Sequence, residues 1–174
     1  QYQASITEYL NAVLLYSLLQ KQEHDFHLRL RPVRIAMPVN LRRFFPSKTL
    51  RNFITMVYPS IDPRLGDYTF EEIVTQVHHY MRYYINSKFL RGDITTNAST
   101  QRNPLIRIVP LFLKDFVVRQ FYQRVQDKNS SAGLTNMGAI RVPDDMKPYL
   151  ERFDIYMGIP YSQRTNCAIV SFEA

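Results

Sequence analysis

The sequence predicts a mixed α/β fold, a two-layer α/β sandwich with a mixed sheet and its helices on one face. Apolar residues recur at helical spacing in three long stretches, and shorter segments rich in branched and aromatic residues lie before and after them. The order along the chain is helix, two strands, two long helices and three strands. Long helices with few strands are typical of one sheet that is covered on one face.

The first predicted helix runs from Ser5 to about Gln22. Its start, Ser5-Ile6-Thr7-Glu8, has the form of a capping box, in which Ser and Glu satisfy free N–H groups of the first turn. Apolar residues then recur at helical spacing and are expected to share one face: Ile6, Leu10, Val13, Leu14 and Leu18. Two strands are expected next, at about Leu30–Val39 and Phe53–Ser60, joined by an arginine-rich loop.

A second capping box, Thr69-Phe70-Glu71-Glu72, opens a helix that is expected at about Phe70–Phe89. Gly92–Asn103 is polar and Thr-rich and is expected to form a loop or a short irregular helix. Leu105–Gln126 is helical by pattern. Pro110 interrupts it, because proline lacks a backbone N–H and disfavours a helical conformation in the residue before it. A kink or two abutting helices are expected there.

Short β-prone segments predominate after the helices. Ala132–Val142 carries glycines that are compatible with a strand, and Asp144–Leu150 is expected to form a turn or a single helical turn. Arg152–Ile159 and Asn166–Phe172 are expected to pair as strands across the loop between them.

Composition indicates one hydrophobic core. A chain of 174 residues with 45% hydrophobic residues suits a single domain, expected over residues 1–174. No apolar run approaches the ~18 residues that a membrane span needs. One cysteine, Cys167, excludes an intramolecular disulfide and fits a reducing compartment, so a cytoplasmic location is expected. The first residue is Gln1 rather than Met, which suggests a domain excised from a longer protein.

Positive charge is concentrated in one stretch. The net charge is +7, and Lys21–Arg51 contains eight Lys or Arg against Glu23 and Asp25. Guanidinium groups suit phosphates, so the stretch is a candidate patch for anionic groups. A solvated strand edge followed by a basic loop is the alternative. Coenzyme A and nucleic acids both carry phosphates, so the charge does not distinguish these ligands.

The segment Pro38–Phe53, PVNLRRFFPSKTLRNF, joins a strand that ends in Asn-Leu-Arg to a Pro-containing loop and Leu-Arg-Asn-Phe. It resembles the D-x-R … P … G-N segment of plant BAHD acyltransferases, alcohol acetyltransferases and peptide-synthetase condensation domains, all of chloramphenicol acetyltransferase-like fold. The resemblance implies that Arg42 ties the loop by charge-assisted hydrogen bonds. Asn52 matches the Asn of the G-N pair, whereas Arg51 stands where Gly is usual.

Two further segments extend this resemblance. Asp154–Pro160 is similar to the D-F-G-W-G-x-P segment of the plant enzymes and keeps its Asp154, Gly158 and Pro160. A structural role is implied for it, and a plain strand end is the alternative.

Leu134–Gly138 resembles the S-N-x-G strand that approaches the reaction centre in alcohol acetyltransferase-like enzymes. The resemblance implies that Thr135, Asn136 and Gly138 face an acyl-CoA channel and offer hydrogen-bond donors near a developing oxyanion. The alternative is a Gly-bearing strand with a β-bulge.

The resemblance as a whole implies the C-terminal lobe of an acyltransferase. The complete enzyme would transfer an acyl group, here expected to be acetyl, from acetyl-CoA to an alcohol or amine. Its catalytic base lies in an HHxxxD motif of the N-terminal lobe, which this sequence lacks. The chain is therefore expected to be inactive alone, to bind no cofactor tightly, and to have its own N-terminal lobe as a partner. An apolar surface exposed by the lost lobe is expected to cause homo-oligomerisation.

The histidines offer no replacement for that base. In His78-His79 the place of the motif's Asp is taken by Tyr83, and His78 is expected on a solvated helix face. His24 and His27 are three residues apart without a third ligand, so no metal site is expected. Aromatic residues follow helical stripes rather than a sheet face, which argues against nucleic acid as a partner. The alternative function is a non-catalytic binding or assembly module with the same fold.

Overall fold

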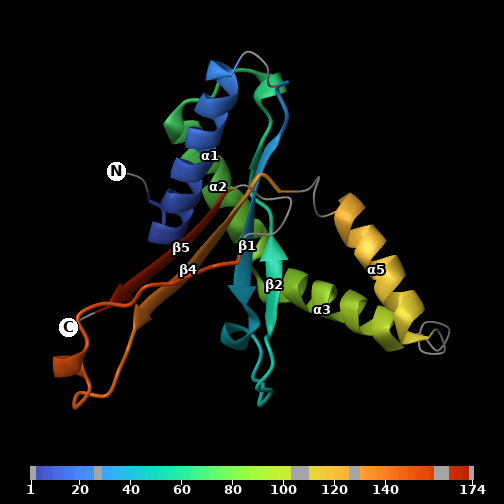
Figure 1. Ribbon diagram of the computed structural model, residues 1–174. Helices are drawn as coiled ribbons and strands as arrows, with labels where there is room; N and C mark the ends of the chain where they lie inside the picture. Colours follow the sequence, from blue (N-terminus) through green and yellow to red (C-terminus); the bar gives the residue numbers. More distant parts are fainter. Residues whose placement is uncertain (1–2, 26–28, 103–109, 126–129, 159–164, 173–174) are drawn as a thin grey trace.

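The structure is a computed structural model that describes residues 3–25, 29–102, 110–125, 130–158 and 165–172 (Figure 1). Mixed helices and strands confirm the α/β class. The elements, in chain order, are α1 (Ile6–His24), β1 (Val33–Asn40), η1 (Leu41–Arg43), β2 (Ile54–Val57), β3 (Ser60–Ile61), η2 (Pro63–Leu65), α2 (Phe70–Tyr84), α3 (Ser87–Arg102), α5 (Leu111–Val125), β4 (Ala132–Ile140), η3 (Lys147–Tyr149) and β5 (Asn166–Phe172).

The described strands form one mixed five-stranded sheet with β1 at its centre. The order is β2-β1-β4-β5, and the short β3 also pairs with β1. β1 is antiparallel to β2 and β3 and parallel to β4, and β4 is parallel to β5. The predicted strand Phe53–Ser60 is interrupted between Val57 and Ser60, so that β2 and β3 pair with opposite ends of β1.

Helices α1 and α2 pack side by side on one face of the sheet and enclose the core (Figure 1). Leu15 of α1, Ile35 of β1 and Ile73 of α2 are completely buried. The buried residues of β1 alternate except at Ala36. In α1 the buried apolar residues are Ala12, Leu15 and Leu19, so the predicted apolar face is wrong at Ile6 and Val13, which are exposed. The predicted layer of helices over one face is nevertheless present for α1 and α2.

Both helices of this layer begin with the predicted capping boxes. The Ser5 hydroxyl accepts a hydrogen bond from the Glu8 N–H at 3.3 Å, and the Glu8 carboxylate accepts one from the Ser5 N–H at 2.7 Å. Thr69 and Glu72 repeat this arrangement at 3.3 and 2.8 Å. Such caps are local in sequence, which is why the starts of α1 and α2 could be predicted.

The helix predicted over Phe70–Phe89 is two helices. α2 ends at Tyr84, and Ile85 leaves the helical conformation with ψ of 65°. The Asn86 side chain then accepts hydrogen bonds from the N–H groups of Lys88 and Phe89, both at 3.0 Å, and begins α3. The new helix continues through the polar stretch that was expected to be a loop or a short irregular helix.

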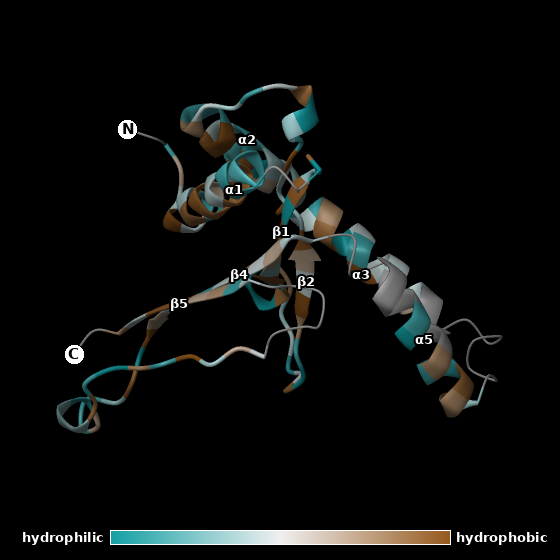
Figure 2. Ribbon diagram, turned by 45° about the horizontal axis from the view of Figure 1, so that its top comes forward, coloured by the Kyte–Doolittle hydropathy of each residue, from teal (hydrophilic) through white to brown (hydrophobic). Residues whose placement is uncertain are grey.

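The change of direction at Asn86 carries α3 and α5 away from the sheet (Figure 2). The expectation that a helix at 105–126 covers the same face as α1 and α2 is therefore wrong. Leu111, Phe112 and Phe116 of α5 are exposed rather than buried. Residues 105–109, next to the expected interruption at Pro110, lie outside the described part of the chain. None of the described helices combines the length and the apolar character that crossing a bilayer requires.

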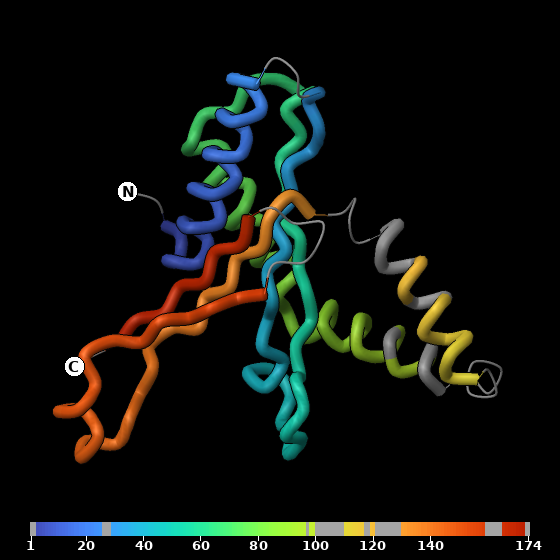
Figure 3. The backbone as a smooth tube through the Cα atoms, viewed as in Figure 1, coloured from blue at the N-terminus to red at the C-terminus, as the bar shows by residue number. Residues whose placement is uncertain are grey.

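The expected pairing of Arg152–Ile159 with Asn166–Phe172 is also wrong. Residues 151–158 have no strand structure, and β5 pairs with β4 instead. Parallel strands require a long connection, because the chain must return to the starting end of the sheet. The chain passes through η3, within the predicted turn Asp144–Leu150, and 151–158 lie on the return path (Figure 3). The Phe153 ring contacts Phe172 at the end of β5, with 5.0 Å between ring centroids.

Replacing Leu15 with Ala is expected to cost about 2–5 kcal/mol of unfolding free energy, because the side chain is fully buried between the helical layer and the sheet. Leu65→Ala is the matched control: Leu65 is 79% exposed, and its truncation is expected to change the free energy by less than about 0.5 kcal/mol. Urea unfolding followed by circular dichroism measures both. Equal losses in the two variants would contradict the position of the core.

Candidate functional site

The segment Thr135–Gly138 lies on β4, and its residues face different sides of the sheet. Asn136 faces the helical layer: its Nδ2 donates to Thr7 Oγ1 of α1 at 2.8 Å, and its Oδ1 accepts from the Gly138 N–H at 2.9 Å. Successive side chains of a strand alternate between faces, so Thr135 faces away from α1. Thr135 and Asn136 therefore do not share a face of the sheet.

A β-bulge separates Asn136 from Gly138. Their partners are consecutive on β5, so Met137 is an extra residue in β4. Gly138 has φ of 73°, in the left-handed region that glycine adopts without steric cost. Its partner Val170 lies two positions beyond the partner of Thr135, so the bulge places Gly138 on the same face as Thr135. The bulged, Gly-bearing strand considered from the sequence is thus present.

Arg42 lies in η1, directly after β1. Its Nη2 donates to the carbonyl oxygens of Thr49 at 2.9 Å and Arg51 at 2.7 Å, and its N–H donates to the Asn40 side chain at 3.0 Å. These are the loop-tying hydrogen bonds that were expected of this guanidinium. They close the exposed loop between η1 and β2 onto the end of β1, and Asn52 in that loop is exposed.

The segment similar to D-F-G-W-G-x-P belongs to the return connection between β4 and β5. Asp154 is exposed there and pairs with Arg152 at 3.2 Å. Gly158 is also exposed, and Pro160 lies outside the described residues. Among these residues only the Asp154 carboxylate makes an ionic contact in the described structure, and that contact is at the surface.

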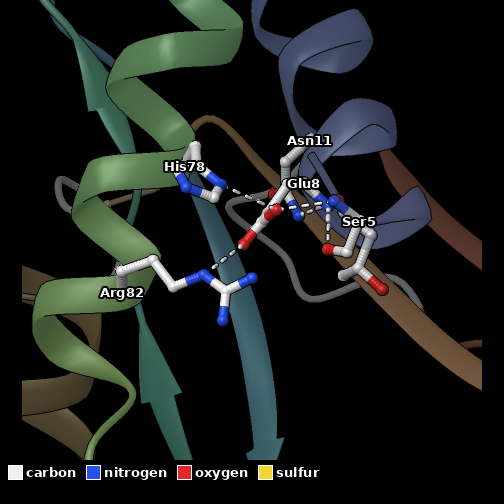
Figure 4. A network of polar contacts seen from close by, with 6 residues as sticks. Ser5, Glu8, Asn11, His78 and Arg82 are labelled. Carbon is white, nitrogen blue, oxygen red and sulfur yellow. Dashed lines mark hydrogen bonds and ion pairs between the residues drawn. The ribbon is translucent and has the colours of Figure 1, made fainter. Parts of the chain in front are cut away.

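A polar cluster around a buried carboxylate, between α1 and α2, was not predicted from the sequence (Figure 4). Its centre is Glu8, whose carboxylate is only 5% exposed and contacts both helices. It accepts from the Ser5 N–H, lies 3.2 Å from His78 Nδ1 and lies 3.8 Å from Arg82 Nε. We call Ser5, Glu8, Asn11, His78 and Arg82 the Glu8 cluster.

Glu8 is an ionised carboxylate at neutral pH. Burial disfavours the charged form and on its own would raise the pKa of Glu8. The backbone N–H of Ser5 and the imidazole of His78 outweigh this, and together they hold the pKa below its ordinary value of 4.5. The cluster thus keeps a negative charge in the seam between two helices.

His78 is half-buried and contacts Glu8 of α1, so its expected place on a solvated face is wrong, although Glu71, Thr75 and Arg82 of the same predicted face are exposed. The physical reason is that α1 meets α2 at the edge of this face. A carboxylate can only accept, so an ionised Glu8 takes its hydrogen bond from the N–H at His78 Nδ1. His79 remains exposed, with its ring edge-on to that of His78. A carboxylate that orients an imidazole is an arrangement that supports general-base chemistry.

Asn11 completes the cluster from within α1. It is completely buried, and its Nδ2 donates to Thr7 O at 2.9 Å and contacts Met37 Sδ at 3.2 Å. Its Oδ1 is buried and finds no hydrogen-bond partner among the described residues. An unpaired buried acceptor costs stability, so Asn11 is not explained by packing.

One sequence signal could have revealed the cluster. Glu8 lies four residues before Ala12 and seven before Leu15, in line with the apolar face of α1. A charged residue on such a face must find a partner when the helix packs. His24 is exposed near the end of α1, and no group of His, Cys, Asp and Glu in the described structure has the arrangement of a metal site.

Comparison of the chain with models of known protein families and with curated protein sequences finds no match. Function must therefore be argued from the residues themselves.

Glu8→Gln is expected to destabilise the fold at pH 7 by about 1–3 kcal/mol, because hydrogen bonds to a buried charged group are lost. The folded pKa of Glu8 is lowered, so its stabilisation is complete above the unfolded pKa and is lost as the pH falls through the folded value. The native chain should thus lose more stability than the variant between pH 7 and acid. Glu72→Gln, the equivalent capping-box residue on an exposed surface, should have the smaller effect. Parallel pH profiles for the native chain and Glu8→Gln in chemical unfolding would argue against this role.

Arg42→Ala is expected to increase amide hydrogen exchange in the loop, most at Thr49 and Arg51, because two carbonyl contacts are removed. Arg43→Ala removes the same charge from the adjacent exposed position and should leave exchange in the loop unchanged. Mass spectrometry of peptic peptides measures both variants. If both variants accelerate exchange equally, charge rather than the hydrogen bonds of Arg42 orders the loop.

Proposed function

We propose that this chain is the C-terminal lobe of a CoA-dependent acyltransferase of chloramphenicol acetyltransferase-like fold, which transfers an acetyl group to an alcohol. The observation that carries the proposal is the Arg42 contact with the loop. A guanidinium directly after a central strand ties back the loop that leads into the next strand. That is the role which the family resemblance implies for this arginine.

β4 supports the proposal by its composition and shape. Thr135 and Gly138 share the face that points away from the helical layer, and the small side chains there leave space for an extended thioester. Thr135 is the candidate donor to the developing oxyanion, by its hydroxyl. Asn136 has a different role in this proposal. Its amide is engaged by Thr7 and Gly138, so it positions the bulge rather than contacting the substrate.

The proposed chemistry assigns no catalytic residue to this chain. A histidine of the N-terminal lobe removes the proton of the acceptor, the resulting alkoxide attacks the thioester carbonyl, and coenzyme A leaves as a thiol. His78 is engaged by Glu8 in the helical layer, whereas Thr135 faces the other side of the sheet. The Glu8–His78 pair is therefore separated from the proposed channel by the sheet itself.

A non-catalytic assembly module is the second candidate, and the exposed apolar surface favours it. Phe112 of α5, with 75% exposure, and Tyr149 and Tyr156 of the β4–β5 connection, with 86% and 93%, contact solvent. Phe112 lies on α5 with the exposed Leu111 and Phe116, apart from the β4–β5 connection (Figure 1), and apolar side chains that gather in this way mark interaction surfaces. In the first proposal they meet the N-terminal lobe, and in the second they meet another protein or a second copy of this chain.

The chain alone is expected to release no thiol from acetyl-CoA above background in the presence of a panel of alcohols, because general-base catalysis contributes typically ~10²–10⁴-fold. The reading frame upstream of Gln1 should encode HHxxxD, and the longer protein should show transfer. In that protein Thr135→Val should lower kcat by about 10²-fold or more if the hydroxyl is an oxyanion donor. The matched control is Thr55→Val, a half-buried Thr on β2.

Two outcomes would contradict the proposal. Turnover by the chain alone that disappears in His78→Ala would place the catalytic base in the Glu8 cluster. An upstream sequence without HHxxxD, together with no transfer by the longer protein, would favour the assembly module.

A further inference from the structure

The loop between η1 and β2 combines exposed basic side chains with an exposed aliphatic one. Arg43, Lys48 and Arg51 are exposed, and Leu50 is the most exposed large apolar side chain reported for the described residues, at 102%. We call residues 41–53 the hairpin tip, since they join the antiparallel strands β1 and β2. The tip projects from the end of the sheet (Figures 1 and 3).

Hydrogen bonds inside the hairpin tip fix its backbone, and its basic side chains and Leu50 are exposed. Arg42 donates to two of its carbonyl groups, and Thr49 and Arg51 N–H groups donate to side chains of the same loop. Phe44 packs against the core, and Phe45 lies under the Arg91 guanidinium of α3, 6.0 Å from the ring centroid. Phe44 and Phe45 thus anchor the tip to the fold, and the third aromatic residue of the tip, Phe53, is half-buried. Leu50 and the basic residues remain exposed and can contact another surface.

The charge around the tip has one sign. No acidic residue occurs between Asp25 and Asp62, a stretch that includes all of β1, the tip and β2. Uncompensated basic residues near an anionic surface gain favourable energy within a Debye length, which is ~8 Å at physiological salt. The binding partner of this tip is therefore an extended anionic surface rather than a single small anion in a pocket.

The kind of apolar residue that the tip exposes distinguishes a lipid bilayer from a nucleic acid as its anionic partner. Proteins that bind single-stranded nucleic acid place aromatic rings where bases can stack. Of the three aromatic residues of the tip, Phe44 and Phe45 contact the rest of the fold, and Phe53 is half-buried rather than exposed. The outward apolar residue is the aliphatic Leu50, which suits the acyl boundary of a bilayer. Ile54 of β2, with 49% exposure, extends this apolar surface next to the tip.

We propose that the hairpin tip docks this protein on an anionic lipid bilayer, with Leu50 inserted below the headgroups and Arg43, Lys48 and Arg51 among them. This is peripheral binding by a loop. It is independent of the proposed acyltransferase function, because it uses neither β4 nor the histidines. Binding should weaken with salt, since screening reduces the charge contribution.

The chain contains no tryptophan, so a single introduced one reports its own surroundings. Leu50→Trp should shift its fluorescence emission to the blue when phosphatidylcholine vesicles that contain phosphatidylserine are added, and should not shift with phosphatidylcholine alone. Leu65→Trp is the matched control. Leu65 is also highly exposed, but it lies in η2, next to the strand that pairs with the opposite end of β1. Its emission should not change.

Co-sedimentation of the native chain with the same vesicles tests the charges. Replacing Arg43, Lys48 and Arg51 with Gln should lower the partition coefficient by about fivefold for each charge removed. The matched control replaces Arg141, Lys147 and Arg152, three exposed cations of the β4–β5 connection, and should reduce binding less. Circular dichroism of each variant establishes that it is folded. Leu50→Ser should weaken binding without changing its salt dependence.

Three outcomes would overturn the proposal: no co-sedimentation of the native chain with anionic vesicles at low salt, equal blue shifts for Leu50→Trp and Leu65→Trp, or equal losses for the two triple variants. Binding of a single-stranded oligonucleotide in the absence of vesicle binding would identify the tip as a nucleic-acid contact instead.

Discussion

β1 is the element on which the rest of the structure depends. Three of the other described strands pair with it, and both helices of the covering layer pack against its buried side chains. Its burial pattern departs from strict alternation at Ala36, which is buried although it lies between Ile35 and Met37. A strand that is enclosed in this way tolerates few changes, because altered volume affects the sheet and both helices together. The end of β1 consequently gives the following arginine-rich loop a fixed base.

What could be predicted from the sequence depends on how local the determining interactions are. The starts of α1 and α2 follow from capping boxes that span four residues, so they were found. The break before α3 is also local, since Asn86 caps the new helix, but the apolar stripe across it concealed this signal. The placement of α5 depends on the direction that the chain takes after this break. The spacing of apolar residues in the sequence gives no information about that direction.

The candidate site was predicted only in part, because some of its contacts are local in sequence and others are not. Arg42 acts on a loop that lies within ten residues, and its contacts agree with the expectation. The Asn136 amide instead meets Thr7, 129 residues earlier in the chain, and Glu8 meets His78 across 70 residues. Such contacts arise only when β4 and α2 dock on the remaining structure. Helical periodicity placed His78 on a polar face of α2 but could not show that Glu8 of α1 meets His78 at the edge of this face.

The pairing of β4 with β1 and of β5 with β4 limits the order in which the strands can join the sheet during folding. Among the described buried apolar residues, only Leu90, Ala132 and Leu134 come from the chain beyond Met81, so α1, β1, β2, β3 and α2 contain most of the core. This part also emerges before β4 and β5 during synthesis. β4 can add only to an existing β1, and β5 only to an existing β4, so the sheet grows outward from its centre. Since β5 pairs with β4 alone among the described strands, its detachment would expose the edge of β4 without breaking the pairs of β1.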